Sequence, residues 1–355
     1  MTQHLQYLSV LKWSSSQYSA LKNCSNHTLE LIYPLLEIPV ISYQFKTETP
    51  ACSVDDHIRN FGKNLSEFWR INRPVFLDTR HLESSILDDN SEAITRCFQL
   101  AEAHGKQVIP VTSPGRSNSY QKAVRSIVKH GLCLRLSPEQ IIKNPDIVTQ
   151  MCSYFQVQSD KVHLVIDYGD ISKRSINKSY EKILQSMQLI PEISRWKTFS
   201  LCGSSYPATM SQVKKLVVDK KERLEWDIWK KIITEGIERK PMFGDYNLSS
   251  AAINKPFRPG LMTVSVTVKY SNNSNWVFVK GLPIKEKDWS QTKELCQNLI
   301  AHEEYMDKKT SWGSLQVWRR AHGEITRGAA VDWRSFGVNH HLTIVASQLS
   351  NLYEI

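Results

Sequence analysis

The polar side chains of this chain that could carry chemistry stand where short apolar segments end. These end positions hold Lys12, Glu37, Asp78, Thr112, Arg135, Asp167, the turn Gly203-Ser204-Ser205 and the sequence Gly244-Asp245-Tyr246. If the four carboxylates of this set met at one place they would repel each other, so a divalent metal, a shared proton or the nearby Lys12 and Arg135 would have to balance their charge. The alternative is that each of them caps a helix or forms an ion pair at the rim of the fold. Both interpretations stay open at this point.

Two adjacent histidines, His340 and His341, stand at the start of the last predicted helix. An imidazole at that position can serve as a ligand, a base or an anion contact. Neighbouring helix positions diverge by about 100°, so we expect the two rings not to serve one site. Packing or helix capping explains such a pair equally well.

Two further features have both a functional and a structural interpretation. The pair Trp312-Gly313 is either a loop that closes over a site or a buried tryptophan, and the second is favoured. Cys202 ends an apolar segment, but no feature pairs it with a base, so a core thiol is favoured over a nucleophile. The chain lacks a phosphate-binding loop, a dinucleotide-binding glycine motif, a zinc-protease motif and a serine elbow. The common cofactor chemistries therefore lose support.

The elements that must position these residues form a repeating pattern of a short apolar run followed by a helical segment. The predicted strands are Leu8–Lys12, Leu31–Ile38, Pro74–Asp78, Gln107–Thr112, Leu132–Leu136, Val162–Asp167, Thr198–Cys202 and Pro241–Asp245. This alternation predicts a parallel sheet. Eight strands can form an open doubly wound sheet, but the count of eight without an extra edge strand favours a closed β/α (TIM-like) barrel. In such a barrel the function lies at the carboxyl ends of the strands.

Apolar residues at helical spacing predict the helices between the strands. Asp55, Ser91 and Ser119 are the predicted N-caps of three of them. The first connection, Gln17 to Asn23, is short and predicts an irregular unit. Helices over 292–303 and 342–352 are predicted to complete the outer ring.

Residues 261–281 alternate polar and apolar side chains on both sides of an asparagine-rich turn. They predict a β-hairpin inserted after the eighth strand. The chain shows no internal repeat and no low-complexity linker, so we expect one domain over 1–355.

The composition is that of a folded globular chain, with 355 residues, of which 41% are hydrophobic and 23% are charged. The net charge of +10 favours acidic partners such as nucleic acid or phosphorylated ligands. The basic clusters Lys214-Lys215 and Asp219–Arg223 are more typical of solvated helix faces. Seven scattered cysteines, with no secretory signal and no membrane-spanning run, predict a cytoplasmic chain with reduced thiols and no membrane partner.

Several segments together resemble the phage beta protein family. They are Val10–Trp13 with Tyr18–Leu21, Pro34–Pro39, Pro74–Asp78, Ile109–Thr112, Gly131–Arg135, Phe243–Tyr246, Lys269-Tyr270 with Trp276, Ser311–Gly313 and Gly337–Leu342. The resemblance covers most of the chain in order. Members of this family occur on satellite phages, prophages and defence islands, and the satellite-phage beta protein is encoded beside a host-killing protein that it is thought to restrain. The resemblance therefore implies a role in a toxin-antitoxin or anti-phage defence cassette, with a neighbouring toxin as partner.

Three hypotheses remain. The chain is an antitoxin-like regulator, a barrel enzyme that hydrolyses a phosphorylated or nucleotide substrate with a metal, or a nucleic-acid-binding effector. For the enzyme, the predicted catalytic residues are Asp78, Asp167, Asp245 and His341. The predicted ligand-binding residues are Lys12, Glu37, Arg135, Ser204, Tyr246, Trp312 and His340.

Overall fold

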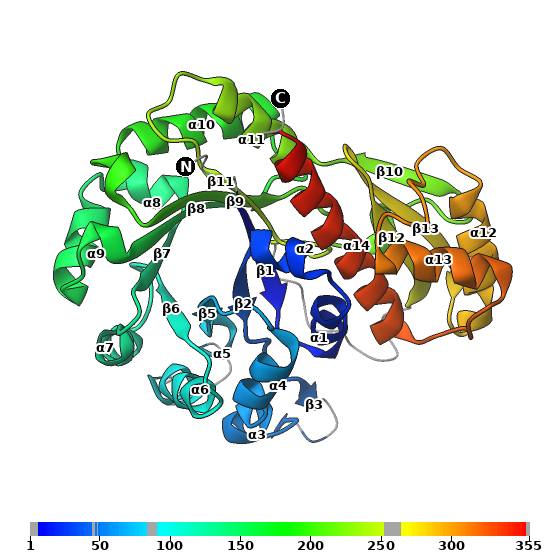
Figure 1. Cartoon of the computed structure of the whole chain (residues 1–355), viewed down its shortest axis with the longest axis horizontal. Helices are drawn as coiled ribbons and strands as arrows, with labels where there is room; N and C mark the ends of the chain where they lie inside the picture. The colour runs from blue at the N-terminus through cyan, green and yellow to red at the C-terminus, as the bar shows by residue number, and fades with distance from the viewer. Residues whose placement is uncertain (1–5, 45–46, 48, 84–90, 252–263, 353–355) are drawn as a thin grey trace.

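The computed structural model describes residues 6–44, 47, 49–83, 91–251 and 264–352. Eight parallel strands close into a barrel in the order β1-β11-β9-β8-β7-β6-β5-β2 (Figure 1). Their bounds are β1 (Tyr7–Lys12), β2 (Ile32–Glu37), β5 (Val75–Asp78), β6 (Val108–Thr112), β7 (Leu132–Leu136), β8 (Val162–Asp170), β9 (Thr198–Ser204) and β11 (Met242–Asp245). The predicted barrel and its eight strands are confirmed.

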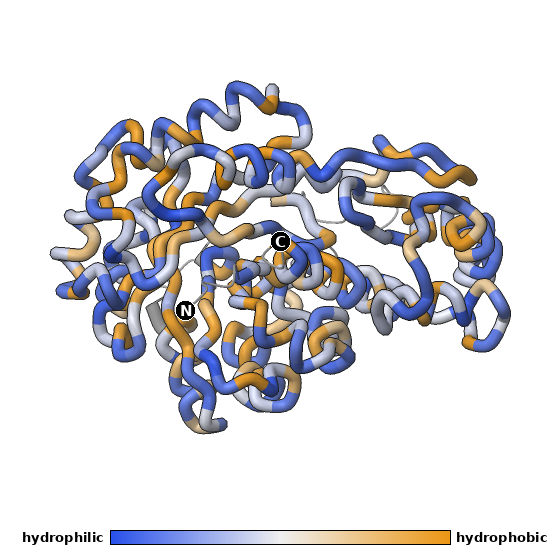
Figure 2. Tube along the Cα trace, turned by 45° about the horizontal axis from the view of Figure 1, so that its top comes forward, coloured by the Kyte–Doolittle hydropathy of each residue, from blue (hydrophilic) through white to orange (hydrophobic). Residues whose placement is uncertain are grey.

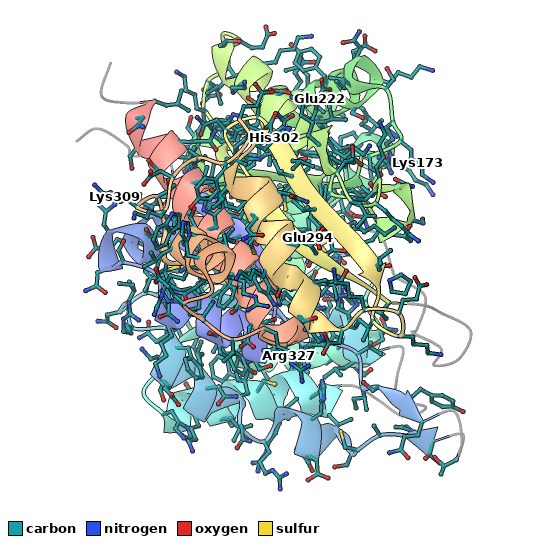
Figure 3. The ribbon with its side chains drawn as sticks, turned by 90° about the vertical axis from the view of Figure 1, so that its right-hand side faces the viewer. Lys173, Glu222, Glu294, His302, Lys309 and Arg327 are labelled. Carbon is teal, nitrogen blue, oxygen red and sulfur yellow. The ribbon has the colours of Figure 1, made fainter. Side chains whose placement is uncertain are left out.

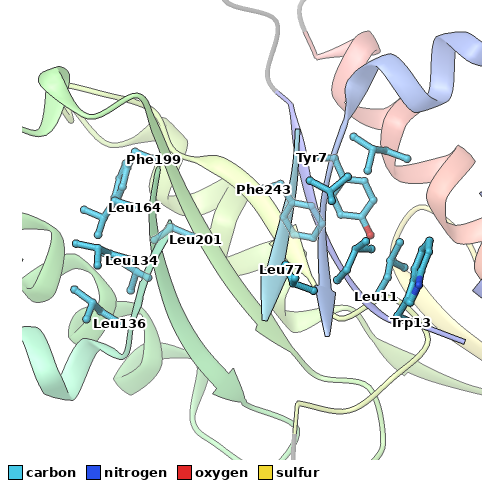
Figure 4. Close-up of a cluster of buried hydrophobic side chains, with 14 of the residues drawn as sticks. Tyr7, Leu11, Trp13, Leu77, Leu134, Leu136, Leu164, Phe199, Leu201 and Phe243 are labelled. Carbon is cyan, nitrogen blue, oxygen red and sulfur yellow. The ribbon is translucent and has the colours of Figure 1, made fainter. Parts of the chain in front are cut away.

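Successive side chains of each barrel strand point to opposite faces, which divides the core into two layers. The outer layer lies between the strands and the helices, and Figure 4 shows part of it, including Leu11, Leu134, Leu164 and Phe243. The inner layer fills the barrel with Leu8, Val10, Leu35, Phe76, Ile109, Val111, Cys133, Val165, Cys202, Met242 and Tyr246. Both faces are therefore apolar along most of each strand, as is usual for parallel sheets.

Helices surround the barrel, and hydrophilic residues alternate with hydrophobic ones along them (Figure 2). They are α1 (Ser15–Lys22), α2 (Asn26–Leu31), α3 (Val54–Ile58), α4 (Phe61–Phe68), α5 (Arg80–Glu83), α6 (Ser91–Ala103), α7 (Asn118–Ile127), α8 (Pro138–Lys143), α9 (Ile147–Phe155), α10 (Ile176–Gln188) and α11 (Leu224–Thr234). The short strands β3 (Tyr43–Gln44) and β4 (Thr49–Pro50) pair with each other. The short first connection holds two helices, α1 and α2.

Two predicted caps are wrong by two residues. Ser53, not Asp55, caps α3 by accepting a hydrogen bond from the backbone N–H of Asp56, and Ser117, not Ser119, caps α7. In each case the backbone of the true cap is not helical, which lets its hydroxyl reach the N–H three residues on.

A three-stranded antiparallel sheet stands beside the barrel, on the right in Figure 1. It consists of β10 (Val218–Glu222), β13 (Asn275–Pro283) and β12 (Ser265–Ser271), and α12 (Thr292–Ile300) and α13 (Trp312–His322) accompany it. Figure 3 faces this side, where α12 crosses the strands and carries Glu294. The predicted hairpin is present, although its residues 261–263 lie outside the described part. The prediction of a helix face over 219–223 is wrong, because residues 219–222 form an edge strand with polar side chains, as exposed edges commonly do, and Arg223 precedes α11.

The last helix, α14 (Ala330–Asn351), begins well before its predicted start and lies between the barrel and the small sheet (Figure 1). His340 and His341 therefore lie in its middle and not at its start. Gly337 permits the close approach of α14 to β12, because a Cβ atom there would lie 2.8 Å from the carbonyl oxygen of Lys269. No helix in the described part of the chain is both long and apolar enough to cross a membrane.

Candidate functional site at the barrel mouth

One arginine connects the polar side chains at the carboxyl ends of the barrel strands. Arg135, at the end of β7, donates to Asp167 over 2.8 Å and to Glu37 and Asp78 over 2.9 Å each. It also donates to the hydroxyl of Tyr246 over 2.7 Å, and that hydroxyl donates in turn to Asp167. The structure thus brings together five predicted site residues from different strands.

The connections after β5 and β6 add three cationic or titratable side chains that the sequence did not indicate. Arg80 lies 2.6 Å from Glu37, and His81 Nε2 lies 3.1 Å from the same carboxylate. Arg116 pairs with Asp78. All three lie in connecting segments beyond the strand ends, whereas the sequence analysis considered only the polar residues that end each strand. Their basic type near two predicted carboxylates was the available clue.

The charges at the mouth are matched by guanidinium groups. Burial alone would raise the pKa of Glu37, but Arg80 and Arg135 hold this pKa well below its ordinary value. Burial opposes ionisation of Asp78 too, while Arg116, Arg135 and Arg80 lower its pKa. Both carboxylates are therefore ionised and paired, and the guanidinium groups balance their charge.

A pocket of about 330 Å³ opens beside this network. It is lined by Asp78, Arg80, Ser113, Gly115, Arg116, Arg135, Leu136, Ser137, Gln140 and Asp167. Three guanidiniums face two carboxylates there, so the lining is suited to an anionic or hydrogen-bonding group. No group of three or more His, Cys, Asp or Glu side chains that could hold a metal occurs among the described residues. The described mouth residues thus do not fit the metal centre that the enzyme hypothesis required.

Lys12, Thr112 and Ser204 end strands but do not join the Arg135 network. Lys12 is half-buried, and its register partner is Glu37 on β2. The Thr112 hydroxyl donates to Gln121 of α7 over 2.8 Å, which places it on the outer face of the barrel. The hydroxyl of Ser204 donates to the backbone carbonyl of Ser249 and holds the loop after β11.

Asp245 lies apart from the other carboxylates, behind the barrel wall. It accepts hydrogen bonds from the Tyr7 hydroxyl, the Asn247 backbone N–H and His341 Nε2, the last over 2.7 Å. An ionised carboxylate only accepts, so Nε2 of His341 carries the proton and Nδ1 accepts from Ser271 over 2.9 Å. Asp245 and Tyr246 are adjacent and point to opposite faces, so only Tyr246 can face the mouth.

The Ser271, His341 and Asp245 side chains have the residue types of a hydrolase triad, but all three are completely buried. Burial lowers the pKa of His341, although the neighbouring Asp245 carboxylate favours the protonated ring. Burial would raise the pKa of Asp245, but His341 and Arg223 lower it below its ordinary value. No substrate can reach this chain of hydrogen bonds. It joins β11, α14 and β12.

His340 and Trp312 lie outside the mouth, in the layer between α14 and the small sheet. His340 stacks on Tyr270 at 3.8 Å and donates from Nε2 to the carbonyl oxygen of Ser271. Burial lowers its pKa to about 3, so the ring is neutral. Trp312 begins α13, is half-buried and packs edge-on against Phe336, so the alternative of a closing loop is wrong and the favoured buried tryptophan is only partly buried.

Cys202 belongs to the apolar filling of the barrel. It is completely buried, and burial raises the pKa of its thiol well above the ordinary value. A thiol in this state is a poor nucleophile.

Comparisons with known proteins found a matching family and several similar solved structures. A family model described as Beta protein matches residues 7–347. Similar solved structures include two mutants of the tryptophan synthase alpha-subunit from the hyperthermophile Pyrococcus furiosus, each 10% identical to this chain. Each match covers 68% of this chain and 86% of that chain, with TM-scores of 0.39 and 0.38. A comparison with curated protein sequences found no match.

Proposed function

The chain belongs to the Beta protein family, and from this premise we propose that it acts in a toxin-antitoxin or anti-phage defence cassette of a phage or mobile element. There it restrains or regulates a neighbouring toxin. The proposal places the protein in the cytoplasm, in keeping with its seven free cysteines. The family's genetic setting supports the cassette, and the chemistry of the mouth supports a binding role.

The observation that carries the binding role is the fourfold hydrogen bonding of Arg135. A general base works best with a pKa near the working pH, whereas Glu37 and Asp78 have lowered pKa values. Their oxygens are also occupied by guanidinium donors. A buried network with this many charge-assisted hydrogen bonds holds its side chains in fixed positions, which suits recognition of a partner or ligand better than proton transfer.

The test is bacterial survival when the neighbouring gene is induced with and without this chain. We expect the wild-type chain to restore growth and to co-purify with the neighbouring protein. The exposed-residue variant Lys122→Gln is the control and should protect equally well. If the chain fails to restore growth, or kills the cells when expressed alone, the restraining role is wrong.

One observation favours a barrel enzyme acting on a phosphorylated or nucleotide substrate as the second candidate. His81 is 25% exposed, and its Nε2 lies 3.1 Å from the Glu37 carboxylate, which orients the ring beside Arg80. This arrangement offers acid–base chemistry without a metal. A His81→Asn variant that folds and still binds the neighbour but no longer protects would favour the enzyme. Unchanged protection by this variant would exclude this assignment of the base.

A further inference from the structure

A second set of cationic side chains gathers where the barrel mouth meets the small sheet. Lys12 ends β1, Lys269 lies on β12, and Arg334 lies in the first turns of α14. The close packing at Gly337 brings β12 against α14 at Lys269. Arg334 lies three residues before Gly337, on the same side of the helix.

A tyrosine with an unused hydroxyl lies in the same place. The Nζ atom of Lys269 is 5.7 Å from the ring centroid of Tyr206, and the charge of Arg334 also acts on this tyrosine. The side chain of Tyr206 is 3% exposed, and its hydroxyl has no hydrogen-bond partner among the described residues. Buried hydroxyls are normally paired, so this one marks a hydrogen bond that the described residues leave unmade.

The three cations lack acidic partners within the described part of the chain. Lys12 has Glu37 as its register neighbour, but the oxygens of Glu37 already bind Arg80, Arg135 and His81. Burial, Arg334 and Lys12 together lower the pKa of Lys269 to about 8. Burial also lowers the pKa of Lys12. Glu37 acts to raise this pKa, whereas Arg80 and Arg334 lower it further. The cations repel each other in the absence of an anion.

We propose that Lys12, Lys269 and Arg334, with the Tyr206 hydroxyl, bind a small molecule that carries two or more linked phosphate groups. Three positive charges match a diphosphate. Lys12 and Lys269 are half-buried at the junction, and Arg334 is exposed beside them. The remainder of the ligand can extend toward Arg80 and the mouth pocket. Such a ligand bridges the barrel, α14 and the small sheet. This site is independent of the proposed cassette role, since it requires no protein partner.

The test is calorimetric titration of the purified chain in buffer free of phosphate and sulfate. The probes are inorganic pyrophosphate and a short single-stranded DNA without terminal phosphates. We expect pyrophosphate to bind the wild type, and Lys269→Gln and Arg334→Gln to weaken this binding at least tenfold. Lys122→Gln removes the same charge from the exposed face of α7 and should leave binding unchanged.

Thermal unfolding provides a second measurement that does not depend on the heat of binding. Pyrophosphate should raise the Tm of the wild type and not that of Lys269→Gln. Without anion, the Lys269→Gln variant should melt no lower than the wild type, because one repelled cation is removed. The proposal is overturned if pyrophosphate does not bind, if the variants bind it as well as the wild type, or if only the DNA binds. The survival assay of the cassette role uses no phosphate ligand, so either proposal can fail alone.

Discussion

The imidazole of His341 donates to the carboxylate of Asp245 over 2.7 Å in a place that solvent does not reach. The two residues come from α14 and β11, 96 positions apart in the chain. Their hydrogen bond fastens the last helix to the barrel wall, and Ser271 extends it to the small sheet. We therefore assign both residues to stability and not to catalysis.

Replacement of Asp245 by Ala should destabilise the fold strongly. The change leaves three buried donors without an acceptor, at a cost of at least about 3 kcal/mol in the free energy of unfolding. Urea denaturation measures this. The control is Asp227→Ala, which removes a half-exposed ion pair with Lys230 and should cost less than about 1 kcal/mol. A stable Asp245→Ala protein that no longer protects cells would show that Asp245 has a chemical role and not a structural one.

Replacement of Arg135 by Met should lower the free energy of unfolding by about 3–5 kcal/mol, because buried carboxylates lose their shared partner. The pH dependence gives a second readout. Glu37 and Asp78 have lowered pKa values in the folded state, so their stabilisation is present above their unfolded values and is lost as the pH falls through the folded ones. Without Arg135 this loss on acidification should be smaller. An equal loss in both proteins would show that Arg80 and Arg116 suffice.

Acid should also weaken the fold through His340. Its folded pKa is about 3, whereas the unfolded chain takes up a proton near pH 6.5. Between these values the unfolded state binds more protons, so stability decreases as the pH falls, by about 3 kcal/mol at pH 4.5. His340→Gln should remove this part of the acid slope, and the exposed His27→Gln should not. Denaturation curves from pH 7 to 4.5 measure both, and an unchanged slope in His340→Gln would disprove the assignment.

Gly337→Ala should destabilise the contact of α14 with β12. The added Cβ would lie 2.5 Å from a methyl carbon of Leu248 and 2.8 Å from the carbonyl oxygen of Lys269. Overpacking of this kind costs about 1–3 kcal/mol, which the better helix propensity of Ala offsets by about 1 kcal/mol. Gly236→Ala meets no atom within 4 Å and is the control for denaturation. Equal stabilities of the two variants would show that the strand moves aside.

The barrel was predictable from sequence because each buried strand is a compact apolar run with a polar residue at its end. Glu37, Asp78, Arg135 and Asp167 were found for this reason, since each end position faces the interior. The same pattern does not predict which face of the strand each end residue points to. The pair Asp245 and Tyr246 was read as one site, although the alternation along a strand allows only one of the two to face the mouth.

The parts that were missed depend on tertiary contacts. Arg80 at the start of α5 and Arg116 in the loop after β6 reach back to the strand ends, and no sequence pattern defines these positions. The edge strand β10 carries Asp219 and Lys220 among other charges, so its pattern is that of a solvated helix. His340 and His341 lie in the middle of α14 and not at a helix start, because the helix continues through Gly337, where the missing side chain allows close packing against β12.

The position of α14 has a consequence for how the protein unfolds. Leu342 and Val345 belong to the main core around the barrel, whereas Trp333 belongs to the core of the small sheet. Neither core is complete without this helix, so loss of one exposes apolar surface of the other. Heat or denaturant should therefore melt the barrel and the small sheet in a single cooperative transition, although the strands form two separate sheets.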